Sequence, residues 1–223
     1  MIATPFPATT MPDADWWQAL WPDPDAVLAR LGITKNGRAV DLCCGDGLFT
    51  APLAGIAREV LAIDLDPSML RLARARAGAA ERHNVLYIAA DACDLARVLA
   101  GRFDFVLIAN TFHGVPDKAR LAEAVLSILA PGGAFGVINW HRRPREETSV
   151  LDRPRGPKME FRMTPDALQA TLEPLGFRQA SLVALPPYHY AAIFVAALNT
   201  RGRPTPGRAT PGRRSPPSSP GTR

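Results

Sequence analysis

The sequence has few cysteines and no long apolar run. Its three cysteines are Cys43, Cys44 and Cys93, and their spacing gives neither a disulfide framework nor a metal-binding motif. No stretch approaches the roughly 18 apolar residues that a membrane-spanning helix needs. The N-terminus lacks the basic start and the apolar run of a secretion signal. We therefore expect a cytoplasmic protein with reduced thiols and no membrane span.

An excess of positive charge is also lacking over most of the chain. The formal net charge is +5, but the last 24 residues carry six arginines and no acid, so the preceding residues carry 20 basic and 21 acidic side chains. The segment 200–223 is rich in proline, glycine and serine as well, a composition typical of disorder. We predict a disordered basic tail there. The near-neutral remainder argues against nucleic acid as a partner.

What the sequence does contain is an alternation of strand and helix patterns. Short apolar runs at 39–42, 60–63, 85–89, 103–109 and 134–139 are separated mostly by helical patterns, which is typical of a parallel sheet covered on both faces. Two further strands are expected at 180–185 and 191–198. Five residues separate them, too few for a parallel crossover, so they should form an antiparallel hairpin. The prediction is an α/β fold: a Rossmann-like, doubly wound, mostly parallel seven-stranded sheet with a C-terminal antiparallel hairpin.

Three regions follow from this pattern. Residues 1–38 form an N-terminal helical cap, in which Asp15 is expected to cap a helix over 16–20 and Asp23-Pro24 to open a second helix. Residues 39–199 form the main domain, and residues 200–223 form the tail.

The strongest motif, Val40-Asp-Leu-Cys-Cys-Gly-Asp-Gly, joins the first strand to its helix. Gly45 and Gly47 permit a sharp turn and a close approach of the backbone to a ligand. Seventeen residues after Gly47, the second strand ends in Asp64, and an acid at this distance can accept hydrogen bonds from both hydroxyls of an adenosine ribose. Asp91 follows the third strand and could receive an adenine amino group, although its neighbour Asp94 is a second candidate.

Dinucleotide-binding proteins share the first two of these features. Their fingerprint G-x-G-x-x-G, however, would need a glycine where this chain has Thr50. The missing glycine favours a ligand without phosphates over a pyrophosphate. A nicotinamide-dependent oxidoreductase is the rival function on these features.

Five segments in order resemble class I S-adenosylmethionine-dependent methyltransferases, in particular the branch of the ubiquinone and menaquinone biosynthesis methyltransferases. They are VDLCCGDG, LAIDLDPSML, the acid of DAC at 91–93, FDFVLIANTFHGVPD and LAPGGAFGVINW, and together they span residues 39 to 140. The resemblance implies an enzyme that binds S-adenosyl-L-methionine and methylates a small-molecule acceptor by direct displacement.

The resemblance also implies where the cofactor lies. Asp41 and the turn Gly45–Gly47 would follow its methionine portion, and the carbonyl of Asn110 would lie near the methionine amino group. The adenosine portion would meet Asp64 at the ribose, Leu65 and Met69 flanking the adenine, and Asp91 with the backbone of Ala92 at the adenine edge. One residue departs from the pattern, because Cys43 stands where the family usually has glycine.

Three of the four histidines map to the carboxyl edge of the predicted sheet. His113 follows the fourth strand, His141 the fifth, and His189 lies in the hairpin. A histidine there could take a proton from an attacking hydroxyl, thiol or amine. We take His141 first, because it closes the fifth strand, and His113 second, because it matches a family position that often carries histidine. Three histidines could instead bind zinc or bond structurally; we assign none to a metal.

Two further segments border this edge. The segment 142–158 could be a lid that attracts an anionic acceptor, or simply a solvated loop; its cations are Arg142, Arg143, Arg145, Arg153, Arg155 and Lys158. Trp16, Trp17 and Trp21 could form a wall for the acceptor or anchor the cap in the core. Two different functions would also fit this sequence: methylation of RNA or protein, and cofactor binding without catalysis.

Overall fold

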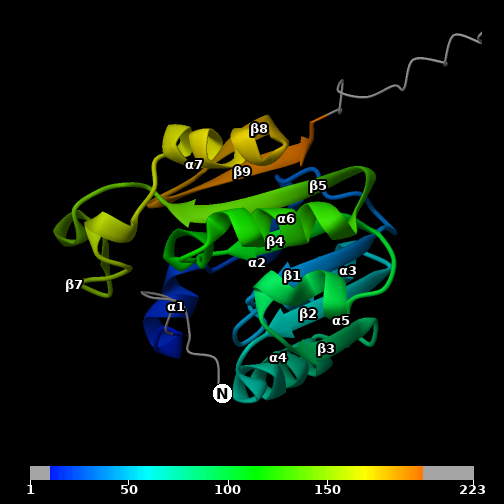
Figure 1. Cartoon of the computed structure of the whole chain (residues 1–223). Coiled ribbons are helices and arrows are strands. Elements are labelled where there is room, and N and C mark those ends of the chain that lie inside the picture. The colour runs from blue at the N-terminus through cyan, green and yellow to red at the C-terminus, as the bar shows by residue number, and fades with distance from the viewer. Residues whose placement is uncertain (1–10, 198–223) are drawn as a thin grey trace, which may run out of the picture.

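The computed structural model describes residues 11–197, so the tail predicted over 200–223 lies outside the described residues, as do the first ten residues of the cap. Seven strands form one sheet in the order β3-β2-β1-β4-β5-β9-β8 (Figure 1). They are β1 (Arg38–Leu42), β2 (Glu59–Asp64), β3 (Val85–Ala89), β4 (Phe103–Ala109), β5 (Leu129–Trp140), β8 (Phe177–Leu185) and β9 (His189–Ala196). The first five run parallel, whereas β9 is antiparallel to both of its neighbours. The predicted fold class and hairpin are confirmed.

Helices cover both faces of this sheet. They are α1 (Ala14–Leu20), α2 (Pro24–Ala29), α3 (Thr50–Ile56), α4 (Pro67–Ala79), α5 (Leu95–Val98), α6 (Lys118–Ile128) and α7 (Pro165–Leu172). Buried residues of α1, α2 and α3 share a hydrophobic cluster on one face, and those of α5, α6 and α7 share a cluster on the other. Between β5 and α7 the chain makes a two-stranded ribbon of β6 (Ser149–Val150) and β7 (Arg153–Pro154).

The two-sided burial explains why the strands read as almost unbroken apolar runs. In β1, Val40 and Leu42 pack into the cluster with α6, while Ala39 beside them packs into the cluster with α3. Successive side chains of a strand point to opposite faces, so a strand covered on both sides needs apolar residues at every position.

Several element boundaries differ from the sequence-based expectation. Helix α1 begins at Ala14 after Asp13, so Asp15 lies inside the first turn rather than at the N-cap, and it accepts a hydrogen bond from the N–H of Trp16. Strand β5 begins at Leu129, and its pairing with β4 is irregular there, since Leu129 lies opposite Phe103 and Ala134 lies opposite Phe105. Strand β9 ends at Ala196.

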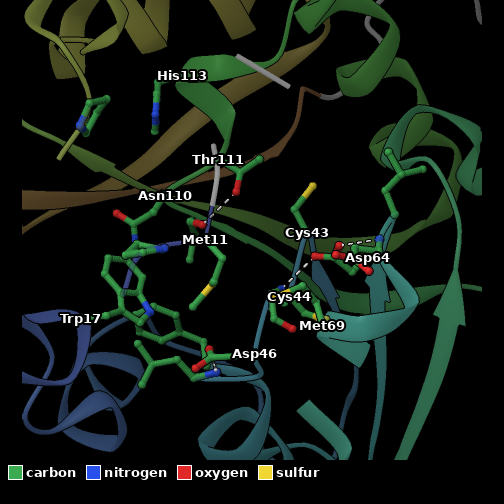
Figure 2. Close-up of a pocket in the computed structure, with 18 of the residues that line it drawn as sticks. Met11, Trp17, Cys43, Cys44, Asp46, Asp64, Met69, Asn110, Thr111 and His113 are labelled. Atoms are coloured by element: carbon green, nitrogen blue, oxygen red, sulfur yellow. Dashed lines mark hydrogen bonds between the residues drawn. The ribbon is translucent and has the colours of Figure 1, made fainter. Parts of the chain in front are cut away.

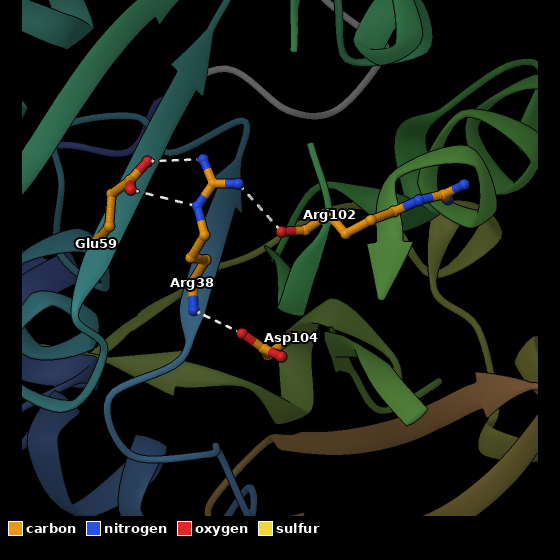
Figure 3. Close-up of polar contacts among 4 residues, drawn as sticks. All are labelled: Arg38, Glu59, Arg102 and Asp104. Carbon is orange, nitrogen blue, oxygen red and sulfur yellow. Dashed lines mark hydrogen bonds and ion pairs between the residues drawn. The ribbon is translucent and has the colours of Figure 1, made fainter. Parts of the chain in front are cut away.

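The amino ends of the central strands are tied together by Arg38 (Figure 3). Its guanidinium donates two hydrogen bonds to Glu59 of β2, at 3.2 and 2.9 Å, and its backbone N–H donates to Asp104 of β4 at 2.8 Å. A third guanidinium bond reaches the carbonyl oxygen of Arg102. These bonds fix the relative positions of β1, β2 and β4 at the edge opposite the cavity described below.

Among residues 11–197, no helix combines the length and the apolar character that crossing a membrane would require.

Candidate functional site

One large cavity opens at the carboxyl ends of β1, β2, β3 and β4, with a volume of about 760 Å³. This is where ligands bind in open parallel sheets, and the volume is typical of small-molecule sites. Figure 2 shows Asn110, Thr111 and His113 on one side of the cavity and Asp64 and Met69 on the other. Of the predicted cofactor residues, those that line it are Asp41, Gly45, Asp64, Leu65, Met69, Asp91, Ala92 and Asn110.

Asp41 lies near the end of β1 and is almost fully buried at 2% exposure. Its carboxylate accepts a 2.6 Å hydrogen bond from the hydroxyl of Thr50, the first residue of α3. Burial, with smaller contributions from the like charges of Asp64 and Asp46, raises the pKa of Asp41 to about 7 against the lowering effect of Thr50. A carboxyl group that titrates near neutrality beside a cavity is typical of a functional site.

The turn after β1 requires left-handed backbone at three positions. Cys43, Gly45 and Gly47 have φ of +54°, +54° and +81°. At Cys43 this conformation is unfavourable for a residue with a side chain, which explains why glycine is usual at that position in the family that the sequence resembles. Burial also raises the pKa of the Cys43 thiol.

The two glycines of the turn serve different contacts. A Cβ on Gly45 would lie 3.0 Å from the Sδ of Met11 on the cavity side. A Cβ on Gly47 would lie 2.6 Å from the Cα of Ala73 in α4, and Gly47 does not line the cavity. Gly47 therefore allows α4 to pack against the turn rather than allowing a ligand to approach.

Asp64, at the end of β2, orders the loops on both sides of it. Its two carboxylate oxygens accept hydrogen bonds of 2.9 Å from the N–H groups of Gly45 and Asp66. Each oxygen of a carboxylate has a further lone pair, so Asp64 can still accept hydrogen bonds from a ligand in the cavity that it lines.

The structure separates the two acids proposed after the third strand. Asp91 lines the cavity and accepts a 2.8 Å hydrogen bond from the N–H of Cys93. Asp94 instead forms an ion pair with Arg120 at 2.5 Å, and it does not line the cavity. Of the two, Asp91 is the one placed to meet a ligand.

Asn110 directly follows β4 and also has left-handed backbone, with φ of +59°. Its amide nitrogen and oxygen are buried and have no hydrogen-bond partner among the described residues. Buried polar groups are nearly always hydrogen-bonded. An amide without a partner in a cavity wall is therefore suited to binding a polar group of a ligand.

The three histidines do not share one position. His113 is buried and lines the cavity. His141 follows β5 outside the lining, with its ring 5.1 Å from that of Tyr190, and burial, followed by the charge of Arg143, lowers its pKa. His189 is buried between Trp21 and Trp140, with ring centroids at 4.5 and 4.1 Å. Within residues 11–197 no three histidine, cysteine or acidic side chains are grouped to hold a metal ion.

The cavity lining also includes aromatic and basic residues. Trp16 and Trp17 of α1 are both buried and line it, so they belong to the core and to the cavity wall at once. The segment 142–158 contributes Arg145, Arg155 and Lys158. Sequence reasoning did not assign a role to several lining residues: Met11 and Phe161 lie outside the matched segments, and Asp46, Thr111 and Trp140 lie within them.

Comparison with known proteins finds a matching family model and curated relatives. Residues 39–133 match the family model of the methyltransferase domain. Ubiquinone biosynthesis O-methyltransferases from Xanthomonas oryzae pv. oryzae and Xanthomonas campestris pv. campestris are 32% and 31% identical to it over 139 residues. The match covers 58% of this chain, and the chain spans 57% of the length of each relative.

Solved structures share the fold over more of the chain. A SAM-dependent methyltransferase from Aquifex aeolicus superimposes with a TM-score of 0.67 and 21% identity, covering 82% of this chain and 93% of that one. The glycopeptide N-methyltransferase MtfA, complexed with sinefungin, has a TM-score of 0.60 and 20% identity, covering 78% and 85%. At these identities the likeness establishes the fold.

Proposed function

We propose that this chain transfers the methyl group of S-adenosyl-L-methionine to a small-molecule acceptor. The observation that carries the proposal is that the methyltransferase domain at 39–133 supplies the acidic part of the cavity. That part holds Asp41, Asp64 and Asp91, each at or close to the carboxyl end of its strand. The relatives named as O-methyltransferases support the choice of a small acceptor.

The residues present fit an adenosyl amino acid. Asp64 keeps lone pairs for ribose hydroxyls, while the side chains of Leu65 and Met69 offer an apolar surface for adenine beside Asp91 and the Ala92 backbone. The cofactor's ammonium and sulfonium charges suit the buried carboxyl of Asp41, and the amide of Asn110 lacks a partner within the described chain. Gly45 has no side chain of its own, and on the cavity side the Sδ of Met11 lies 3.0 Å from where a Cβ would stand.

The chain's own contribution to catalysis would be mainly positioning. S-adenosylmethionine supplies a methyl group already activated by its sulfonium, so holding an acceptor in line can provide most of the acceleration. An acceptor that loses a proton also needs a base. His113 lines the cavity and His141 does not, so we now favour His113 as the base, while a role for His141 stays a prediction.

The proposal also includes an expected location and an expected kind of partner. The three cysteines are free thiols, which supports a location in the reducing cytoplasm. The near-neutral charge before residue 200 supports a small molecule rather than nucleic acid as the partner.

Calorimetry with S-adenosylmethionine tests the proposal first. Asp64→Ala and Asp91→Ala should each weaken binding by about tenfold or more, as expected when hydrogen bonds to a charged group are lost. Asp94→Ala is the matched control, because Asp94 pairs with Arg120 outside the cavity; it should bind normally. Far-UV circular dichroism would confirm that each variant is folded.

Turnover is then measured with methyl-labelled S-adenosylmethionine and a cell extract. Label should appear in the small-molecule fraction, and it should be lost with Asp64→Ala and reduced with His113→Ala. Label found in RNA or protein alone would overturn the acceptor class, and binding without any transfer would reduce the protein to a cofactor binder.

A further inference from the structure

The negative and the positive side chains that line the cavity come from different segments of the chain. Its carboxylates are Asp41, Asp46, Asp64, Asp66 and Asp91, which lie near the ends of β1, β2 and β3 or in the loops that follow them. Its arginines and lysine are Arg145, Arg155 and Lys158, which all come from the single segment 142–158. The acidic part is already accounted for by the proposed cofactor, so the basic part is available to a second molecule.

Among the described residues, no carboxylate forms an ion pair with this basic part. The ion pairs within residues 11–197 are Arg38–Glu59, Arg76–Asp46 and Arg120–Asp94, and none includes a cation from the segment 142–158. The Nε of Arg155 is moreover buried without a hydrogen-bond partner in the described structure. Leaving such a donor unsatisfied costs free energy, and an anion bound beside it would recover that cost.

Hydrogen bonds of its backbone groups fix the position of Arg155. Its N–H donates to the carbonyl oxygen of Thr148 at 2.9 Å. Its carbonyl oxygen accepts from the Thr148 hydroxyl at 2.8 Å and from Nη2 of Arg162 at 3.1 Å. Both Thr148 and Arg162 are buried. The position of Arg155 is thus set by buried partners, as binding residues require.

Arg155 lies against a flat aromatic surface. The guanidinium of Arg155 lies 5.2 Å from the ring centroid of Trp16. Gly156, the next residue, has φ of +83°, and a Cβ on it would lie 2.9 Å from the indole of Trp140. Trp16, Trp17, Trp140 and Phe161 all line the cavity. Rings of this kind pack favourably against a planar aromatic ligand.

We infer that the methyl acceptor is a planar aromatic molecule that carries a carboxylate, and that Arg155 with Lys158 binds this carboxylate. The inference rests on the proposed function, because it assigns the acidic part of the cavity to S-adenosylmethionine. It deepens that function by giving the acceptor a charge and a shape. Arg155 determines the specificity for this acceptor, because a guanidinium can donate two hydrogen bonds to one carboxylate.

A matched pair of probes tests the charge. 4-Hydroxycinnamate and its methyl ester have the same ring and hydroxyl group, and only the former is an anion. In calorimetry with and without S-adenosylhomocysteine, the acid should bind at least about tenfold more tightly than the ester, because only the acid forms charge-assisted hydrogen bonds. Equal affinities, or no binding of either probe, would overturn the inference.

Variants then locate the anion site. Arg155→Gln and Lys158→Gln should each weaken the acid by about tenfold and leave the ester unchanged. Arg153→Gln removes the same charge from an exposed residue of the same segment outside the cavity lining, so it should change neither affinity. An equal loss with Arg153→Gln would mean that only net charge matters, and the assigned site would be wrong.

Binding of S-adenosylhomocysteine alone separates the two proposals. If it binds and the acid is not preferred, only the acceptor inference fails. If it does not bind while the acid is still preferred and Arg155→Gln removes the preference, the anion site stands and the proposed methyl transfer fails.

Discussion

At the scale of single residues, Asp41 is a buried carboxyl group that lines the cavity. The pKa of its carboxyl rises from 3.8 to about 7, chiefly because burial disfavours the ionised form. The folded protein therefore holds a proton there that the unfolded chain releases. The contribution of this carboxyl group to the free energy of unfolding is fully present below pH 3.8, and it is lost as the pH rises toward 7.

Asp41→Asn should therefore stabilise the protein at pH 8 and change little at pH 4. Asparagine is neutral at every pH and its amide oxygen can still accept the hydrogen bond from Thr50. The rise of the pKa from 3.8 to about 7 would correspond to about 4 kcal/mol at 1.36 kcal/mol per pKa unit. Relaxation of the protein around the buried ion lowers this cost, so we expect a gain of about 2 kcal/mol at pH 8. Urea unfolding at both pH values measures it, and a gain of the same size at pH 4 would contradict the explanation.

Some features of the site residues could be predicted from the sequence and others could not. The acids at strand ends were predictable, because a strand pattern fixes where its carboxyl end lies and Asp64 and Asp91 are found there. That the Asn110 amide has no partner among the described residues was not predictable, because this depends on the whole cavity wall. Cys43 stood out in the sequence only as an exception, and its φ of +54° supplies the reason.

At the scale of elements, the strands were predictable and their order was not. Unbroken apolar runs reveal strands covered on both faces, and β3 and β4 begin and end where their patterns do. The insertion of β9 between β5 and β8 is a pairing between distant segments, and local periodicity carries no information about it. The ribbon β6–β7 was missed because each of its strands has two residues.

The packing of α4 against the glycine turn gives a prediction at this scale. Gly47→Ala should destabilise the fold by about 2–4 kcal/mol, because a Cβ would lie 2.6 Å from the Ala73 backbone and φ is +81°. Gly78→Ala is the control, since a Cβ there meets nothing within 4 Å and α4 would gain helix propensity of up to about 1 kcal/mol. Thermal melting of both variants measures these effects, and a similar Tm for the two would refute the packing role of Gly47.

At the scale of the whole molecule, charge is distributed unevenly along the chain. Everything before residue 200 carries 20 basic and 21 acidic side chains, and the six arginines of the tail account for the net charge of +5. The proposed activity is confined to the cavity, to which only residues 11–161 contribute lining side chains in the described structure.

Deleting residues 200–223 should therefore leave S-adenosylmethionine binding and small-molecule turnover within about twofold of the full chain. Any retention of RNA at low salt should fall sharply, because phosphate binding depends on the number of cationic contacts. Turnover assays and gel mobility shifts on both proteins measure this. Loss of turnover when the tail is deleted would contradict the expectation that the activity is confined to the cavity.

The position of β9 has a consequence for the order in which the protein is made. The ring of His189 packs between those of Trp21 and Trp140, and Trp140 is paired with that residue across β5 and β9. A ribosome that has just added Trp140 must still add 49 residues before this partner exists, which takes roughly 2 to 10 s at usual synthesis rates. The acidic part of the cavity can assemble during translation, whereas its aromatic part is completed only by one of the last strands to be synthesised.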